Sequence, residues 1–197
     1  MQPLLHLASM SPRRSELLAQ IGVVHSIIKI DVDETPHPGE LPEEYVIRLA
    51  QEKALAGQDA LNLPGHPLVL AADTSVVVDG RILGKPRDRE HALEMMRLLS
   101  NRKHWVHSGV ALAGAVTASR LSSSEVNFCT ITPDQAAAYW DSQEPADKAG
   151  GYGIQGLGAI FITRIEGSFS GVMGLPLFET AQLLTQAGID PLKPLDR

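Results

Sequence analysis

The sequence predicts an α/β fold. Segments in which apolar residues recur at helical spacing alternate along the chain with short runs rich in Val, Ile and Leu. The 197 residues, 44% of them hydrophobic, suffice for one large domain, and we find no internal repeat, low-complexity tract or linker that would divide them. We therefore expect residues 1–197 to form a single domain of two lobes.

The first half of the chain supplies helices and strands in alternation. "PLLHLA" and "HSIIKI" are predicted strands on either side of a helix with Ser11 as N-cap and Pro12 at its first position. "LPEEYVIRLAQEKALAG" predicts a second helix, because Pro42 and two glutamates suit its first turn. "HPLVLAADTSVVVDGRILGKP" predicts two strands joined by a type I′ turn at Asp79-Gly80, and "DREHALEMMRLLS" predicts an amphipathic helix.

The second half predicts a further group of strands between two helices. "HWVHSGVALAG" and "SSSEVNFCTIT" have the composition of strands. Thr132 and Gln135 form a capping box at the start of the helix "PDQAAAYWDS". "GAIFITRIEGSFSGVMG" predicts a hairpin, and "LPLFETAQLLTQAG" predicts a closing helix.

Charge and composition exclude several classes of function. A net charge of −6 disfavours a general binder of nucleic acid or anionic membranes, although a local basic pocket is still compatible with it. The longest apolar run is interrupted by Asp73, so we expect no membrane span. Cys129 is the one cysteine, and the start "MQPLLHLASMS" lacks the features of a signal peptide. We therefore expect a cytoplasmic protein without disulfides.

Two arginines stand at an unusual place, the first turn of the first predicted helix. Arg13 and Arg14 lie where the helix dipole is positive, which costs about 0.3–1 kcal/mol for each cation. An anion would reverse this cost, because the unpaired backbone N–H groups of the helix, Ser9, Ser11 and both guanidinium groups would converge on it. The stretch "ASMSPRRSELL" therefore predicts an anion site.

Asp73 is the most informative single residue. It lies within or at the end of a strand that is otherwise apolar, so its carboxylate must be paired, bind a metal, or act as a base with a shifted pKa. A salt bridge to a neighbouring Lys or Arg is the structural alternative. Thr74 belongs to the opposite face of a regular strand, and we therefore expect that a turn is needed to present both residues to one site.

Other polar residues extend this site, although each signal is weak alone. Lys85 follows the predicted hairpin in "ILGKP", and Glu34 ends the acidic stretch "IDVDET", which could ligate a divalent cation or simply be solvated. "DKAGGYGIQGLG" contains Asp147, Lys148 and Gln155 in a glycine-rich setting. It matches G-x-G-x-x-G but lacks the preceding strand and following helix of a dinucleotide site.

Taken together, these residues indicate a phosphoester or phosphoanhydride site. Lys53, Lys85 and Lys148 add cations for a polyphosphate to those of the first helix. Asp73 and Glu34 would supply carboxylates to Mg²⁺ or to a water molecule. Neither the histidines nor the serines show the spacing of a zinc site or a catalytic triad.

The same residues occur in stretches that resemble the Maf family of nucleoside triphosphate pyrophosphatases. The similarity covers nearly the whole chain: "LASMSPRRSELL", "DVDET", "RLAQEKA", "AADT", "LGKPRD", "DKAGGYGIQG" and "VMGLPLFET" follow in the order and spacing of that family. The resemblance implies a Maf/ITPase-like α/β fold with a mixed, twisted central sheet flanked by helices. Two lobes would enclose a deep nucleotide-binding cleft. It further implies a cytoplasmic homodimer that requires Mg²⁺ or Mn²⁺.

The resemblance also implies roles for individual residues. Asp73 matches the proton acceptor of the family, while Arg13, Thr74 and Gln155 match the three positions associated with base choice and are similar to the branch that acts on dTTP and UTP. The expected reaction is the hydrolysis of a nucleoside triphosphate to the monophosphate and pyrophosphate. The residues expected to bind substrate or phosphate are Ser9, Ser11, Arg14, Lys53, Lys85, Asp147 and Lys148. Glu34 and Asp73 are expected to hold the metal.

Two alternatives remain open at this point. The dTTP/UTP branch also acts on some modified pyrimidine nucleotides, whereas the first alternative is the same chemistry on 7-methyl-GTP or on non-standard purines. The protein could also be a nucleotide sensor that regulates septum formation, because the family is linked to inhibition of that process. A substrate panel and an Asp73→Asn variant discriminate between these functions.

Overall fold

A computed structural model describes residues 5–193 and contains one seven-stranded mixed sheet. The order is β2-β1-β3-β5-β6-β7, with β4 also paired to β3. The pairs of β1 with β2 and β3 are parallel, and all other pairs are antiparallel. The strands are β1 (Leu5–Leu7), β2 (His25–Ile27), β3 (Leu68–Val78), β4 (Arg81–Leu83), β5 (Lys103–Ala113), β6 (Ala118–Phe128) and β7 (Ile162–Glu166).

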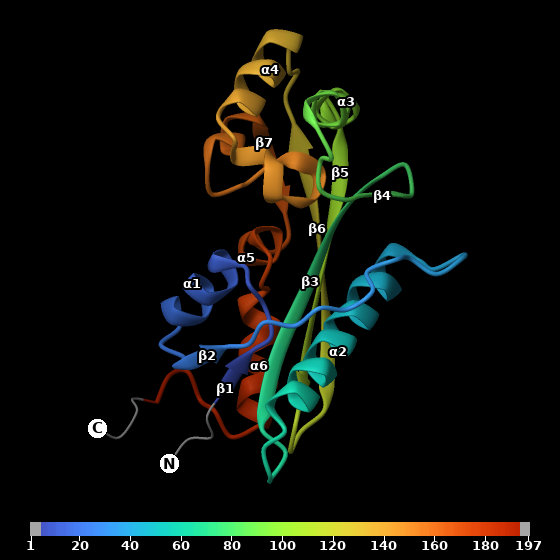
Figure 1. Cartoon of the computed structure of the whole chain (residues 1–197). Coiled ribbons are helices and arrows are strands. Elements are labelled where there is room, and N and C mark those ends of the chain that lie inside the picture. The colour runs from blue at the N-terminus through green and yellow to red at the C-terminus, as the bar shows by residue number, and fades with distance from the viewer. Residues whose placement is uncertain (1–4, 194–197) are drawn as a thin grey trace.

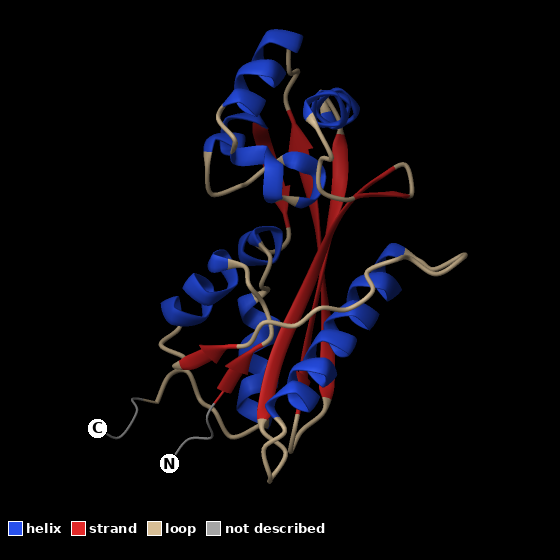
Figure 2. Ribbon diagram, in the orientation of Figure 1, coloured by secondary structure: helices blue, strands red, loops and turns tan. Residues whose placement is uncertain are grey.

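Three long strands, β3, β5 and β6, run along the length of the molecule (Figure 1), with helices beside them (Figure 2). At one end lie α1, α2 and α6 with the short strands β1 and β2, and at the other lie α3, α4 and β7. The α-helices are α1 (Pro12–Gln20), α2 (Pro42–Leu61), α3 (Arg89–Leu99), α4 (Pro133–Asp141), α5 (Phe169–Met173) and α6 (Leu177–Gln186). The short 3₁₀ helices are η1 (Glu144–Asp147), η2 (Ala149–Gly151) and η3 (Leu157–Phe161).

The two faces of β3 pack against different helices. Val69 and Ala71 contribute to a core cluster with residues of α2, whereas Leu70 and Ala72 contribute to a cluster with residues of α1 and α6. This alternation is the period of two that a β-strand imposes on its side chains. Asp73 therefore belongs to the α2 face of the strand, and its neighbour Thr74 to the opposite face.

The backbone of α2 lies directly against the sheet beside Asp73. Gly109 of β5 is the register partner of Asp73, and a Cβ atom at Gly109 would overlap the Val46 carbonyl group of α2. Glycine at this position therefore permits a close approach between helix and sheet. The approach brings Lys53 of α2 within hydrogen-bond distance of Asp73.

One edge of β3 is open in its middle. β1 pairs with Leu68–Leu70 and β4 pairs with Val76–Val78, so residues 71–75 have no strand partner on this edge among the described residues. The opposite edge is paired continuously with β5. Side chains from both faces of β3 can therefore reach the space beside this gap.

Most predicted elements are confirmed, and one is wrong. Asp79 and Gly80 have φ angles of 51° and 73°, as a type I′ turn requires, and Thr132 and Gln135 form the predicted capping box. The segment predicted as a hairpin forms η3, β7 and then helix α5, which is capped by the Ser168 side chain. The mixed sheet flanked by helices is the predicted fold class. Within residues 5–193, no helix is both long and apolar enough to cross a membrane.

Candidate active site

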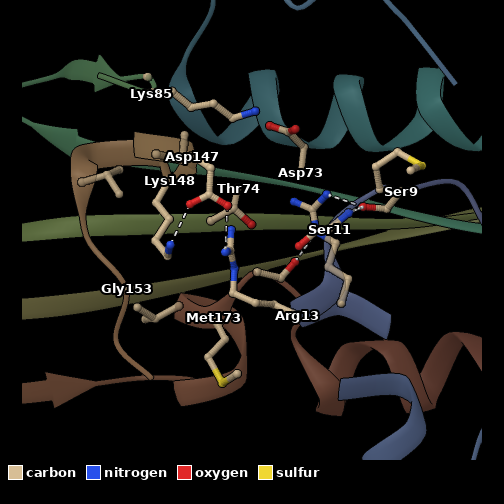
Figure 3. A pocket seen from close by; sticks show the side chains of 18 of the residues that line it. Ser9, Ser11, Arg13, Asp73, Thr74, Lys85, Asp147, Lys148, Gly153 and Met173 are labelled. Carbon is tan, nitrogen blue, oxygen red and sulfur yellow. Dashed lines mark hydrogen bonds and ion pairs between the residues drawn. The ribbon is translucent and has the colours of Figure 1, made fainter. Parts of the chain in front are cut away.

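A cavity of about 560 Å³ lies beside the open edge of β3 (Figure 3). Its lining comes from the segment after β1, from α1, α2, β3 and β4, and from the glycine-rich segment 147–155. All twelve residues predicted from the sequence line this one cavity: Ser9, Ser11, Arg13, Arg14, Glu34, Lys53, Asp73, Thr74, Lys85, Asp147, Lys148 and Gln155. Five of them are basic and three are acidic, which makes the cavity positive in a chain of negative net charge.

The start of α1 faces the cavity, as the sequence predicts. Ser11 occupies the N-cap position, but its side chain makes no capping hydrogen bond, and its backbone N–H donates to Ser9 Oγ over 3.2 Å. Arg14 donates from Nη1 to Ser9 Oγ over 3.2 Å and from Nε to the Gly174 carbonyl over 2.8 Å. These bonds fix the guanidinium group beside the positive end of the helix, where an anion would be stabilised.

Asp73 and Glu34 share one buried ammonium group. Lys53 Nζ lies 2.6 Å from Asp73 Oδ1 and 2.6 Å from Glu34 Oε1. The side chains of Lys53 and Asp73 are 9% and 11% exposed, whereas that of Glu34 is 55% exposed. The salt bridge foreseen as the structural alternative for Asp73 is therefore present. It is part of the cavity wall and so does not exclude a chemical role.

The pKa values of the two carboxyl groups shift in opposite directions, and their burial differs. Burial raises the pKa of Asp73 above its ordinary value, although the charges of Lys53 and Arg14 and the bond to Lys53 act in the opposite direction. Partial burial also raises the pKa of Glu34, but the hydrogen bond and charge of Lys53, with Lys85 and Arg14, lower it further and leave a net decrease. A raised pKa makes the Asp73 carboxylate a stronger base than an ordinary aspartate, which suits a proton acceptor.

The remaining cations lie on the other walls. Lys85 is exposed and extends into the cavity (Figure 3). Asp147 binds Arg13 Nη1 at 3.4 Å and Lys148 Nζ at 2.6 Å, and Lys148 Nζ also donates to the Glu144 carbonyl. Asp147 thus joins α1 to the glycine-rich segment and contacts two cations of the cavity wall.

Thr74 and Asp73 reach the same cavity without the turn that the sequence analysis anticipated. Both residues lie inside the regular strand β3, and the gap in its edge exposes both of its faces. Thr74 Oγ1 lies 2.7 Å from Ser108 Oγ of β5. Gln155 is exposed at the cavity wall. The expected turn is therefore wrong, and a missing strand partner replaces it.

Sequence reasoning missed residues that hold the site in position. Glu144 accepts hydrogen bonds from the Tyr139 hydroxyl at 2.8 Å and from the backbone N–H groups of Leu157 and Gly158 at 2.7 and 3.0 Å. These bonds enclose the glycine-rich segment that carries Gln155. The weak sequence signal is an acidic residue beside a run of glycines whose N–H groups need acceptors.

Asp73 and Glu34 are the carboxylates of the cavity that could hold a divalent cation together with a bound phosphate. Within residues 5–193, no group of three or more His, Cys, Asp or Glu side chains could hold a metal alone. Mg²⁺ usually binds through one or two carboxylates together with substrate phosphates and water. Asp73 and Glu34, which both contact Lys53, supply this type of donor set.

A family model described as Maf-like protein matches residues 4–187. The chain belongs to the Maf family. A relative from Nitrosomonas europaea, named dTTP/UTP pyrophosphatase, is 52% identical and covers 94% of this chain and 95% of its own. The relative from Methylobacillus flagellatus, with the same name, is 52% identical over 94% of this chain and 93% of its own. Among solved structures, the Staphylococcus aureus Ham1 protein matches this Maf chain with 20% identity and a TM-score of 0.42, covering 66% of this chain and 72% of its own.

Proposed function

We propose that this protein hydrolyses dTTP and UTP, and modified pyrimidine nucleotides of the same edge pattern, to the monophosphate and pyrophosphate. The names of its relatives, which match at about half of all positions over more than nine-tenths of the chain, support this choice. The observation that carries the proposal is the placement of a buried carboxylate, Asp73, in the wall of a cavity lined by five basic side chains. A triphosphate needs those cations, and its hydrolysis needs a proton acceptor.

The reaction needs both the carboxylate of Asp73 and the cations that line the cavity. Asp73 accepts a proton from a water molecule while the water oxygen forms a bond to the α-phosphorus. The bond between the α-phosphorus and the bridging oxygen then breaks, and pyrophosphate leaves with the electron pair. Arg14, Lys85 and the N-terminus of α1 neutralise the charge on the phosphate oxygens. Mg²⁺ or Mn²⁺, held by Asp73 and Glu34 with the phosphates, would stabilise the charge that develops on the leaving group.

The base would be recognised by Arg13, Thr74 and Gln155. A glutamine amide can donate to O4 and a threonine hydroxyl can accept from N3–H, so Gln155 and Thr74 together can pair with the edge that uracil and thymine share. Cytosine presents an N4 amino group and an unprotonated N3 instead. Polar groups of the cavity that the bound base covers would then be left unpaired, which produces strong discrimination.

The proposal extends to the assembly and environment of the protein. We infer a homodimer in the cytoplasm from the family resemblance, and the amino-acid composition agrees with this environment. Size-exclusion chromatography with light scattering tests the dimer, for which a mass near twice that of one chain is expected. A monomeric mass at micromolar concentration would exclude it.

The decisive experiment measures pyrophosphate release from dTTP, UTP, CTP, dATP, GTP and 7-methyl-GTP with Mg²⁺ or Mn²⁺. We expect release from dTTP and UTP, no release after EDTA treatment, and recovery when the metal is restored. Asp73→Asn should abolish turnover but retain nucleotide binding, whereas Asp134→Asn, which lies in the first turn of α4, should remain active.

Other outcomes of the panel favour the alternatives. A preference for 7-methyl-GTP would keep the mechanism and overturn the assignment of base choice to Arg13, Thr74 and Gln155. Tight binding without turnover on any nucleotide would instead favour a sensor of nucleotides that acts on cell division.

A further inference from the structure

A chain of three polar groups runs from the cavity into the interior of the protein. Thr74 Oγ1 lies 2.7 Å from Ser108 Oγ, and Ser108 Oγ lies 2.7 Å from the Gly171 carbonyl oxygen of α5. Thr74 and Ser108 are register partners on β3 and β5, and Ser108 is fully buried. The chain therefore connects a residue of the cavity wall to a fixed backbone acceptor.

The direction of these hydrogen bonds is determined by the end of the chain. A carbonyl oxygen can only accept, and a serine hydroxyl has a single proton to donate. Ser108 must donate this proton to Gly171, because the reverse arrangement would place two unprotonated oxygens 2.7 Å apart. Thr74 must then donate its own proton to Ser108. Its hydroxyl consequently presents lone pairs, and no proton, to the cavity.

We propose that Ser108 is a specificity-determining positioning residue, which holds the Thr74 hydroxyl as a hydrogen-bond acceptor and so selects bases with a protonated ring nitrogen. This inference rests on the proposed function and deepens it. Uracil and thymine carry N3–H and can donate to Thr74. Cytosine carries an unprotonated N3, whose lone pair would face the lone pairs of the hydroxyl, and this contact costs the free energy of an unpaired buried group.

The surroundings of Ser108 allow it to be tested without disrupting the fold. The Gly171 carbonyl also accepts the Gly174 N–H at 2.9 Å, so it keeps a partner when the Ser108 hydroxyl is removed. In Ser108→Ala, the Thr74 hydroxyl loses its acceptor and is free to turn its proton toward the cavity. It could then donate to N3 of cytosine.

The experiment compares kcat/KM for UTP and CTP in the wild type and in Ser108→Ala. We expect the ratio of kcat/KM for UTP to that for CTP to fall about tenfold, mainly because kcat/KM for CTP increases. This is the change expected when the unpaired contact between the Thr74 hydroxyl and N3 of cytosine is removed. Ser108→Thr, which keeps a hydroxyl at this position, should restore the ratio. Ser122→Ala is the matched control, because Ser122 is the buried register partner of Ser108 on β6 and lies outside the hydrogen-bond chain.

A second variant keeps the proposal falsifiable if Ser108→Ala does not fold. Thr74→Val removes the acceptor and retains the β-branched shape, so kcat/KM should fall about tenfold for UTP and change little for CTP. In the Thr74→Val background, Ser108→Ala should have no further effect on the ratio. Equal losses for UTP and CTP in Thr74→Val, or an unchanged ratio in folded Ser108→Ala, would overturn the inference. Absence of pyrophosphate release by the wild type would instead refute the proposed function itself.

Discussion

Lys53→Met removes a buried positive charge and keeps an unbranched side chain of similar length. The lost ammonium group contacts both Asp73 and Glu34 at 2.6 Å, so the variant leaves Asp73 buried without its closest cation. An opposite charge at such a distance lowers the pKa of a carboxyl group by about 1–3 units. Its removal should therefore raise the pKa of Asp73 further.

The same change should lower stability. Removing one partner of a buried ion pair costs about 3–5 kcal/mol because the other charge is left uncompensated, so the free energy of unfolding should fall by up to about this amount once Asp73 is ionised. In the variant, the pKa of folded Asp73 lies well above its unfolded value of about 3.9. The loss of stability should thus be small below that value and grow as the pH rises through the raised pKa. Glu34 is largely exposed and can be solvated by water instead.

Denaturant unfolding of the wild type and Lys53→Met between pH 4.5 and 8 measures this difference. We expect it to increase with pH and to become independent of pH when both proteins also carry Asp73→Asn. Lys85→Met removes an exposed cation from the same cavity and should change stability little at any pH. A difference that is constant with pH, or that decreases as the pH rises, would refute the coupling of Lys53 to Asp73.

Three further predictions follow from contacts in and near the site. Because the pKa of Asp73 is raised above 3.8, kcat/KM should decline as the pH falls through the raised value. A value of kcat/KM that stays unchanged down to pH 4 would contradict this. Glu144→Gln weakens an acceptor of two backbone N–H groups, so the free energy of unfolding measured with denaturant should fall by about 1–3 kcal/mol. Gly109→Ala should lower the free energy of unfolding by about 1–3 kcal/mol, because its Cβ would overlap the Val46 carbonyl. Gly84 has open space around it, so Gly84→Ala should change the free energy of unfolding little in the same denaturant experiment.

The periodic and capped elements are predictable from the sequence because their signals are local. The capping box of Thr132 and Gln135 and the turn at Asp79-Gly80 are contained within four residues, and both are confirmed. The misassigned hairpin contains a five-residue helix, α5, which is too short to develop a helical apolar period. Its local signals are the N-cap, Ser168, and Gly174 at its end.

The lining of the cavity is predictable for a different reason. Residues such as Asp73 and Arg14 conflict with their local environment, a buried strand and a helix N-terminus, and such conflicts indicate function. Their partners are not predictable in this way. Ser108 lies 34 residues from Thr74 and shows no conflict with its own strand, so its position in the hydrogen-bond chain emerges only from the register of β3 and β5.

Asp73 and Thr74 are adjacent in β3, but they lie on opposite faces of the strand and have different partners. Asp73 lies on the face of α2 with Lys53, whereas Thr74 lies on the face of α5 with Ser108. Under the proposed function, substitutions on the α2 face should therefore change the rate and its pH dependence, and those on the α5 face should change base choice. Lys53→Met should shift the acidic limb of kcat/KM but leave the ratio of UTP to CTP unchanged, and Ser108→Ala should do the reverse. If either variant changed both quantities together, the two faces of the strand would not act independently.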